Sequence, residues 1–220
     1  MFDKIIDFDK NLLVSINNFK SDFFDDFFFI FSGQLAWLLT ATVIISVLII
    51  NQKKDFVFVV LALVLLIALS DHISSGIIKK LVERQRPTHE PTLEGMVNIV
   101  HNYKGGGFSF VSSHAANGFA FATFSALLMK NRMYSITQLV WAFFTGYSRL
   151  YLGVHYPLDV LCGSIVGIGA GFLVYFILKK TRPACCQKPV TNLQALWITG
   201  SLVLTLAVIS IWHGNLLWLA

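Results

Sequence analysis

Three short blocks of the sequence hold the side chains best suited to chemistry. Block one is residues 79–87, block two is residues 111–114 and block three is residues 148–159. Together they supply three cations, two histidines, two serines and a carboxylate, namely Lys79, Arg86, Arg149, His114, His155, Ser112, Ser113 and Asp159. These residue types in combination are typical of a site that processes a phosphate group.

Block three places a histidine and a carboxylate on one helical turn. His155 and Asp159 are four residues apart, and Pro157 suits the first position of a helix. Asp159 can therefore reach back to the imidazole. A carboxylate on one ring nitrogen fixes the tautomer and makes the other nitrogen a better nucleophile or base.

Block two immediately precedes an apolar stretch. Ser112 and Ser113 are candidates for the N-cap of a helix. The first turn of a helix has free N–H groups and the positive end of the dipole, which suit an oxyanion or a phosphate. His114 at this point could exchange a proton with a bound phosphate ester. The alternative is a simple cap followed by an interfacial histidine.

Block one follows the second apolar stretch. Lys79 and Arg86 are seven residues apart and share one face if the helix continues to Pro87, which would then end it. Asp71 and Ser75 fall on the same face at steps of four. Two cations at the mouth of a membrane span need an anionic partner. The alternative is that basic side chains snorkel to lipid phosphates, which suits Lys80 and Arg84 best.

The composition of the chain indicates which solvent surrounds these blocks. Of 220 residues, 55% are hydrophobic and 13% are charged, and the mean hydropathy is +0.68. A soluble domain has about 25% charged residues. This composition argues against soluble globular, disordered and repeat proteins. The net charge of +5 lies in short gaps between apolar runs, so it indicates a membrane surface rather than nucleic acid.

The apolar residues form six long stretches, at about 27–50, 56–78, 115–129, 133–148, 157–178 and 193–219. A membrane-spanning helix needs about 20 residues, so we expect the third and fourth stretches to extend into the flanking blocks. Residues 1–20 have apolar side chains at steps of three and four, which predicts an amphipathic helix in the membrane interface or an ordinary packing helix. The prediction is an all-α, single-domain membrane bundle of six transmembrane helices spanning residues 1–220.

The basic residues orient this bundle. Gaps 51–55, 130–132 and 179–192 contain eight bases and one acid, and the other side contains nine bases and eleven acids. Acids count little in the positive-inside rule, but several of the nine bases belong to the three blocks, and discounting these places the gaps in the cytoplasm. The N-terminus, the loop 86–113 and the turn 149–156 then lie on the outer face. All three blocks fall on that side, which predicts an active site on the periplasmic or external face of the cell inner membrane.

The three blocks resemble the signature of the PAP2 (type 2 phosphatidic acid phosphatase) superfamily, which is Lys-x6-Arg-Pro, Pro-Ser-Gly-His and Ser-Arg-x5-His-x3-Asp. Blocks one and three match completely and in order. Block two has Val111 in place of Pro and Ser113 in place of Gly, while Ser112 and His114 match. The signature covers residues 79–159, and the six-span layout extends the resemblance to most of the chain.

The resemblance implies a role for each residue. His155 would attack phosphorus and form a phosphohistidine, and Asp159 would orient it. His114 would protonate the leaving oxygen and then activate water. The phosphate would be held by Lys79, Arg86, Arg149, Ser112 and the backbone amides of Ser113 and His114. The resemblance implies no metal and no cofactor.

The implied substrates are lipid phosphates of the bacterial envelope. Lipid A phosphates and undecaprenyl diphosphate are favoured, and phosphatidylglycerol phosphate and phosphatidic acid are possible. One alternative is a phosphotransferase that uses the same intermediate. Another is a non-catalytic transporter or lipid-binding protein, for which the intramembrane Asp71 would be suitable. An inactive relative should have lost His155 or Asp159, and both are present.

Overall fold

The computed structural model describes residues 2–220, and no strand occurs in that range. The all-α prediction is therefore confirmed. The α-helices are α1 (Phe2–Asn17), α2 (Asp22–Ser32), α3 (Leu38–Gln52), α4 (Phe56–Asp71), α5 (Lys79–Val82), α6 (Ser113–Met129), α7 (Arg132–Tyr151), α8 (Pro157–Thr181) and α9 (Asn192–Trp212). A π-helical segment, His72–Ile78, joins α4 to α5 without a break.

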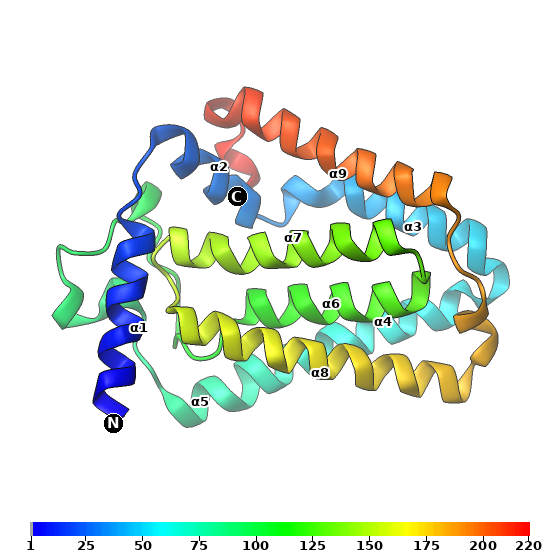
Figure 1. Ribbon diagram of the computed structural model, residues 1–220, viewed down its shortest axis with the longest axis horizontal. Coiled ribbons are helices and arrows are strands. Elements are labelled where there is room, and N and C mark those ends of the chain that lie inside the picture. The colour runs from blue at the N-terminus through cyan, green and yellow to red at the C-terminus, as the bar shows by residue number, and fades with distance from the viewer. Residues whose placement is uncertain (1) are drawn as a thin grey trace.

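The long helices run side by side along the long axis of the molecule, and α1 crosses one end of them (Figure 1). Helix α6 lies in the middle and packs most extensively against α8 and α7, and also against α4. The short connections α3–α4, α6–α7 and α8–α9 lie at the end opposite α1. The three blocks therefore meet at the α1 end of the bundle.

A stripe of glycines allows α8 to approach α6 closely. A Cβ atom on Gly163 would lie 2.5 Å from the carbonyl oxygen of Ser112, and one on Gly171 would lie 2.7 Å from Cβ of Thr123. A Cβ on Gly167 would overlap the carbonyl oxygen of Ala116. Small residues at a spacing of four are a common way for membrane helices to pack backbone against backbone. This contact fixes the start of α6 relative to the start of α8.

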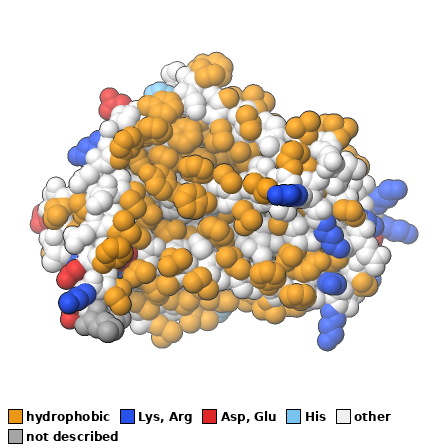
Figure 2. Space-filling view, in the orientation of Figure 1, with side chains coloured by type: hydrophobic (Ala, Val, Ile, Leu, Met, Phe, Trp, Pro, Cys, Tyr) orange, Lys and Arg blue, Asp and Glu red, His pale blue; other side chains and the backbone are white. Residues whose placement is uncertain are grey.

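The outer surface of the bundle is apolar over most of the face shown in Figure 2. Large hydrophobic side chains such as Val64, Ile165 and Phe176 are more than half exposed. Three helical stretches of the described chain, Leu35–Leu93, Pro157–Thr181 and Asn192–Asn215, are long and apolar enough to cross a membrane. An apolar surface of this extent needs lipid as its solvent, so the chain is a membrane protein.

The first apolar stretch is not a single helix. The helix beginning at Asp22 ends at Ser32, and α3 begins only at Leu38. Gly33 has an extended backbone, and a Cβ atom there would lie 2.5 Å from the carbonyl oxygen of Leu219. The chain breaks here because its C-terminal residues pack against Gly33, a long-range contact that local hydropathy does not contain.

The helix of block one also ends earlier than expected. It stops at Val82 rather than at Pro87, and Glu83 adopts a left-handed backbone with φ of 51°. Residues 83–86 lie outside any helix, and Arg86 is extended. Pro87 instead opens a short 3₁₀ turn. The prediction that Pro87 terminates the helix is wrong.

Candidate active site

His155 and Asp159 meet as their spacing predicts. Nδ1 of His155 lies 3.4 Å from Oδ2 of Asp159, and both residues are buried. Helix α8 begins at Pro157, and Asp159 is its third residue, where Oδ2 accepts the N–H of Tyr156 at 2.9 Å. This capping bond fixes the carboxylate and so the ring that contacts it.

The carboxylate of Asp159 has two further partners that sequence reasoning missed. The hydroxyl of Ser109 donates to Oδ2 and lies 3.5 Å from Nδ1 of His155. Arg84 Nη1 donates to Oδ1 at 2.8 Å. Ser109 is fully buried. Each oxygen of the carboxylate is thus occupied, which holds Asp159 ionised and in one orientation.

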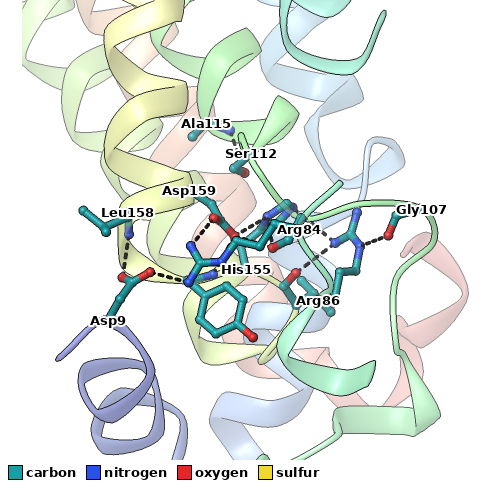
Figure 3. Close-up of polar contacts among 12 residues, drawn as sticks. Asp9, Arg84, Arg86, Gly107, Ser112, Ala115, His155, Leu158 and Asp159 are labelled. Atoms are coloured by element: carbon teal, nitrogen blue, oxygen red, sulfur yellow. Dashed lines mark hydrogen bonds and ion pairs between the residues drawn. The ribbon is translucent and has the colours of Figure 1, made fainter. Parts of the chain in front are cut away.

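Arg84 links the site to α1 (Figure 3). Its Nη2 donates to Oδ2 of Asp9 at 2.8 Å, and its guanidinium lies 3.6 Å from the ring centroid of Tyr156. Oδ1 of Asp9 accepts the N–H of Leu158 at 2.9 Å. The expectation that Arg84 snorkels to lipid is wrong, because two carboxylates and an aromatic ring hold it in the protein.

Arg86 contacts the other ring nitrogen of the histidine. Its Nη1 lies 3.2 Å from Nε2 of His155 and donates to the carbonyl of Val154 at 2.9 Å. Its Nε donates to the carbonyls of Gly106 and Gly107 at 3.0 and 3.2 Å. Since arginine is always a donor, Nε2 carries the lone pair and Nδ1 carries the proton. That is the tautomer a nucleophilic Nε2 requires.

Arg149 is a buried cation with few protein partners. It is 2% exposed, and its Nη2 donates to the hydroxyl of Tyr103 at 2.8 Å. Its Nε–H finds no acceptor among residues 2–220. A buried guanidinium with free donors is costly unless an anion completes it. Arg149 therefore marks a place for an anion beside His155.

Block two forms the start of α6. The side chain of Ser112 accepts the N–H of Ala115 at 3.4 Å, and its own N–H donates to the carbonyl of Asp159 at 2.9 Å. The N–H groups of Ser113 and His114 lie in the first turn, so they have no intrahelical acceptor. Ser113 is helical and needs no glycine, which explains how the chain tolerates the departure from the signature.

The remaining predicted residues come together around His155. Lys79 is within electrostatic range of Arg86 and Arg149, and His114 is within range of the same three cations and of His155. The hydroxyl of Ser113 lies 2.7 Å from that of Ser75, which donates to Asp71 at 3.0 Å. Arg86 thus contacts Nε2 of His155, Arg149 is within electrostatic range of the same ring, and Lys79 and His114 complete the cluster.

Burial shifts the pKa values of His155 and Asp9, which lie outside the membrane-spanning helices. Burial lowers the pKa of His155 to about 3, although the hydrogen bond that its Nδ1–H donates to Asp159 opposes this shift. His155 is therefore neutral at physiological pH. Burial raises the pKa of the Asp9 carboxyl, while the N–H of Leu158 and Arg84 oppose that shift.

No three histidine, cysteine, aspartate or glutamate side chains in residues 2–220 come close enough to hold a metal ion. The site instead has cationic side chains and backbone donors around a neutral imidazole. This arrangement can bind a phosphate dianion and present a nitrogen lone pair to it.

Comparisons with known proteins agree with this geometry. The family model described as the PAP2 superfamily matches residues 56–183. A lipid A 4'-phosphatase of Bacteroides thetaiotaomicron is 38% identical over 182 residues, covering 82% of this chain and 81% of that protein. A lipid A 4'-phosphatase of Porphyromonas gingivalis is 30% identical over 179 residues, covering 81% and 76%.

A solved structure gives the same picture. The crystal structure of Aquifex aeolicus LpxE matches with a TM-score of 0.57 and 30% sequence identity. The match covers 74% of this chain and 92% of that one.

Proposed function

The chain belongs to the PAP2 superfamily, and from this premise we propose that it is a membrane enzyme that hydrolyses phosphate esters of envelope lipids. The observation that carries the proposal is Arg149, a guanidinium 2% exposed with one protein acceptor for its side chain among residues 2–220. A phosphoryl group bound beside His155 supplies the anion that Arg149 needs. Both catalytic histidines and Asp159 are retained, which argues against a non-catalytic transporter.

In the first step, Nε2 of His155 attacks phosphorus. The new P–N bond forms while the bond from phosphorus to the ester oxygen breaks, and His114, as an imidazolium beside the bound phosphate, gives one proton to that leaving oxygen and becomes neutral. Asp159 accepts the Nδ1–H bond and stabilises the positive charge that develops on the ring. The pKa of about 3 means that almost all His155 is already the neutral nucleophile at pH 7.

In the second step, His114 accepts a proton from water as the water oxygen attacks phosphorus. The P–N bond breaks, inorganic phosphate leaves and His155 returns to its neutral form. Lys79, Arg86, Arg149 and the N–H groups of the first turn of α6 stabilise the phosphoryl oxygens in both transition states. Removing one such donor typically slows an enzyme about 10²–10³-fold.

The substrate we favour is a phosphorylated sugar of lipid A. The two lipid A 4'-phosphatases match over most of their length as well as over most of this chain. A relative that acts on undecaprenyl diphosphate matches only 34% of this chain, so that substrate ranks second.

The fold and the distribution of charge support a membrane arrangement. We propose that α3, α4, α6, α7, α8 and α9 cross the membrane as one domain, with the three short connections in the cytoplasm. Arg and Lys gather at the end of the molecule opposite α1, as the positive-inside rule requires (Figure 2). The site then faces the periplasm of an inner membrane. Helix α1 lies in the interface, with Asp9, Leu13 and Asn17 buried against protein and Ile5 and Phe8 exposed towards lipid.

Phosphate release tests the proposal. The purified protein in detergent, with a chelator present, is given lipid A, undecaprenyl diphosphate, phosphatidylglycerol phosphate and phosphatidic acid in turn. We expect release from lipid A that is lost in His155→Ala and kept in His89→Ala, a change at an exposed loop histidine. Release that survives in His155→Ala would contradict the mechanism. Loss of lipid phosphate without free phosphate would instead identify a phosphotransferase.

A further inference from the structure

A cavity beside the start of α6, which we name the vestibule, has a volume of about 410 Å³. Its polar lining includes Asp71 of α4 and Ser113, His114 and Asn117 of α6, together with Ser32, Gln34 and Thr145. Four aromatic side chains form much of the rest of the lining, namely Phe31, Trp37, Phe121 and Trp141. Since His114 belongs to both the vestibule and the candidate active site, a phosphate ester bound at the site would have its remaining group next to this cavity.

Two polar atoms of the vestibule lining are buried without a hydrogen-bond partner among residues 2–220. They are the acceptor Oδ1 of Asn117 and the donor Nε1–H of Trp141. A buried polar atom left unpaired is destabilising, because it has lost its bond to water without gaining another. A bound molecule that offers one donor and one acceptor at these positions would remove that cost.

Asp71 adds a charged acceptor to the same lining. One of its oxygens accepts the hydroxyl of Ser75, and the side chain is otherwise exposed on the apolar α4. A carboxylate within a membrane helix is expensive, and such residues usually face a polar cavity or a ligand. Asp71 and Asn117 together require a ligand with O–H or N–H donors.

This requirement separates the lipid classes. The diacylglycerol unit of phosphatidic acid and a polyprenyl chain carry no O–H or N–H donor, whereas an acylated amino sugar carries hydroxyl and amide donors and acceptors. Aromatic walls with a few polar groups also suit the apolar faces of a sugar ring. Building on the proposed function, we propose that the vestibule binds the sugar that bears the phosphate, and that Asp71 and Asn117 select saccharolipids.

A neighbouring apolar groove can hold an acyl chain of such a lipid. It has a volume of about 310 Å³ and shares Trp37, Phe121 and Trp141 with the vestibule. Most of its other lining residues are aliphatic, including Ile44, Leu48 and others of α3, α4 and α9. An acyl chain attached to the sugar can follow the shared aromatic wall into this groove.

The test compares two substrates in wild type and Asn117→Ala. The substrates are a hexa-acylated diglucosamine phosphate and a phosphatidic acid in the same detergent. We expect the ratio of kcat/KM, saccharolipid over phosphatidic acid, to fall about tenfold or more in Asn117→Ala and in Asp71→Ala, as loss of a neutral or charged hydrogen bond predicts. Asn11→Ala, at an exposed asparagine of α1, is the matched control and keeps the wild-type ratio.

An unchanged ratio, or an equal loss of kcat/KM on both substrates, would overturn the role of the vestibule. Neither outcome would contradict the proposed phosphatase function. A second measurement does not depend on turnover. A glucosamine lipid without phosphate and a triacylglycerol, which has no O–H or N–H donor, both with brominated chains, are titrated against tryptophan fluorescence. The sugar lipid should quench at lower concentration, and Asn117→Ala should remove that preference. Equal quenching by the two lipids would sink the proposal even if the protein hydrolyses neither phosphate.

Discussion

Asp159 is held by side chains from widely separated parts of the chain, and Ser109 is the one that also reaches His155. We expect Ser109→Ala to lower kcat about 10–100-fold with little change in KM, because a hydrogen bond to a charged group contributes about 1.5–3 kcal/mol and this one orients the nucleophile. Steady-state kinetics on the preferred lipid measure the split. Ser210→Ala removes a serine that bonds only the carbonyl of Leu206, and it serves as the control.

A rise in KM with kcat unchanged in Ser109→Ala would contradict a positioning role. Ser109→Thr keeps the hydroxyl, so partial recovery of kcat in that variant is the second expected result.

Arg84 is a single cation shared by two carboxylates. Arg84→Met leaves Asp9 and Asp159, which are 1% and 0% exposed, without their cation. Breaking a buried ion pair on one side is strongly destabilising, so we expect a lower Tm and a loss of activity. Arg84→Lys cannot bond both carboxylates in the same fork geometry and should recover stability more than activity. Thermal unfolding in detergent, followed beside kcat, distinguishes the variants.

An Arg84→Met protein with wild-type Tm and kcat would show that the link to α1 is dispensable.

The depressed pKa of His155 has a consequence for stability. In the folded protein this ring stays neutral down to about pH 3, whereas in the unfolded chain it binds a proton below about pH 6.5. Acidification from pH 7 to pH 5 therefore favours the unfolded state, and stability rises again with pH. We expect Tm to fall less over this interval in His155→Ala than in wild type. His89→Ala should keep the wild-type acid sensitivity, and an equal fall in all three proteins would contradict the assignment.

Signature residues within one helical turn or at one helix start were predictable from their spacing, whereas Lys79 and Arg86 do not share a helix. His155 and Asp159 are an example of a predictable pair, since Pro157 and the spacing of four fix their geometry locally. Ser109 and Arg84 were not predictable, because they bond Asp159 only in the folded chain, across 50 and 75 residues. Asp9 was not predictable for the same reason, since it bonds Arg84 and the N–H of Leu158, which lies 149 residues away. A weak signal existed in Asp9, a carboxylate one helical turn before the apolar Leu13, with which it shares the buried face of α1.

At the scale of elements, the segment after α5 shows why an extended backbone matters. In a strand-like segment, residues two apart point the same way, whereas in a helix they lie about 200° apart. With residues 83–86 outside the helix, Arg84 reaches Asp159 and Arg86 reaches His155. Hydropathy and the position of Pro87 predicted a longer helix, which would have turned one of the two arginines away.

The contact between α6 and α8 positions the two histidines, since His114 opens α6 and His155 precedes α8. Gly167→Ala places a Cβ against the carbonyl oxygen of Ala116, so the helices must separate. We expect a lower Tm and a loss of activity of at least about tenfold, because small displacements in an active site are costly. Gly169→Ala is the matched control, since a Cβ there meets nothing within 4 Å.

Because alanine favours a helix over glycine by about 1 kcal/mol, Gly169→Ala should be neutral or slightly stabilising. Equal behaviour of the two alanine variants would exclude a role for the glycine stripe in activity.

At the scale of the whole molecule, composition sufficed to predict an all-helical membrane protein. The spacing of apolar residues and the positions of charged residues could not predict where the first apolar stretch breaks. That break depends on the packing of residues near Leu219 against Gly33. The grouping of the three blocks at one end could be predicted, since alternating short and long connections put them on one side. The same alternation sets the sidedness of the active site, which is open to direct measurement.

Sidedness predicts opposite labelling of two loops. With the three native cysteines replaced by alanine, Met96→Cys lies in the long loop near the site, where Met96 is 48% exposed. Lys54→Cys lies in the exposed turn between α3 and α4. We expect a membrane-impermeant maleimide to label position 96 in intact cells with a permeable outer membrane, and position 54 only after lysis. The reverse pattern would place the site in the cytoplasm, where its lipid phosphate would have to come from the inner leaflet. Labelling of both positions in sealed cells would exclude the six-span arrangement.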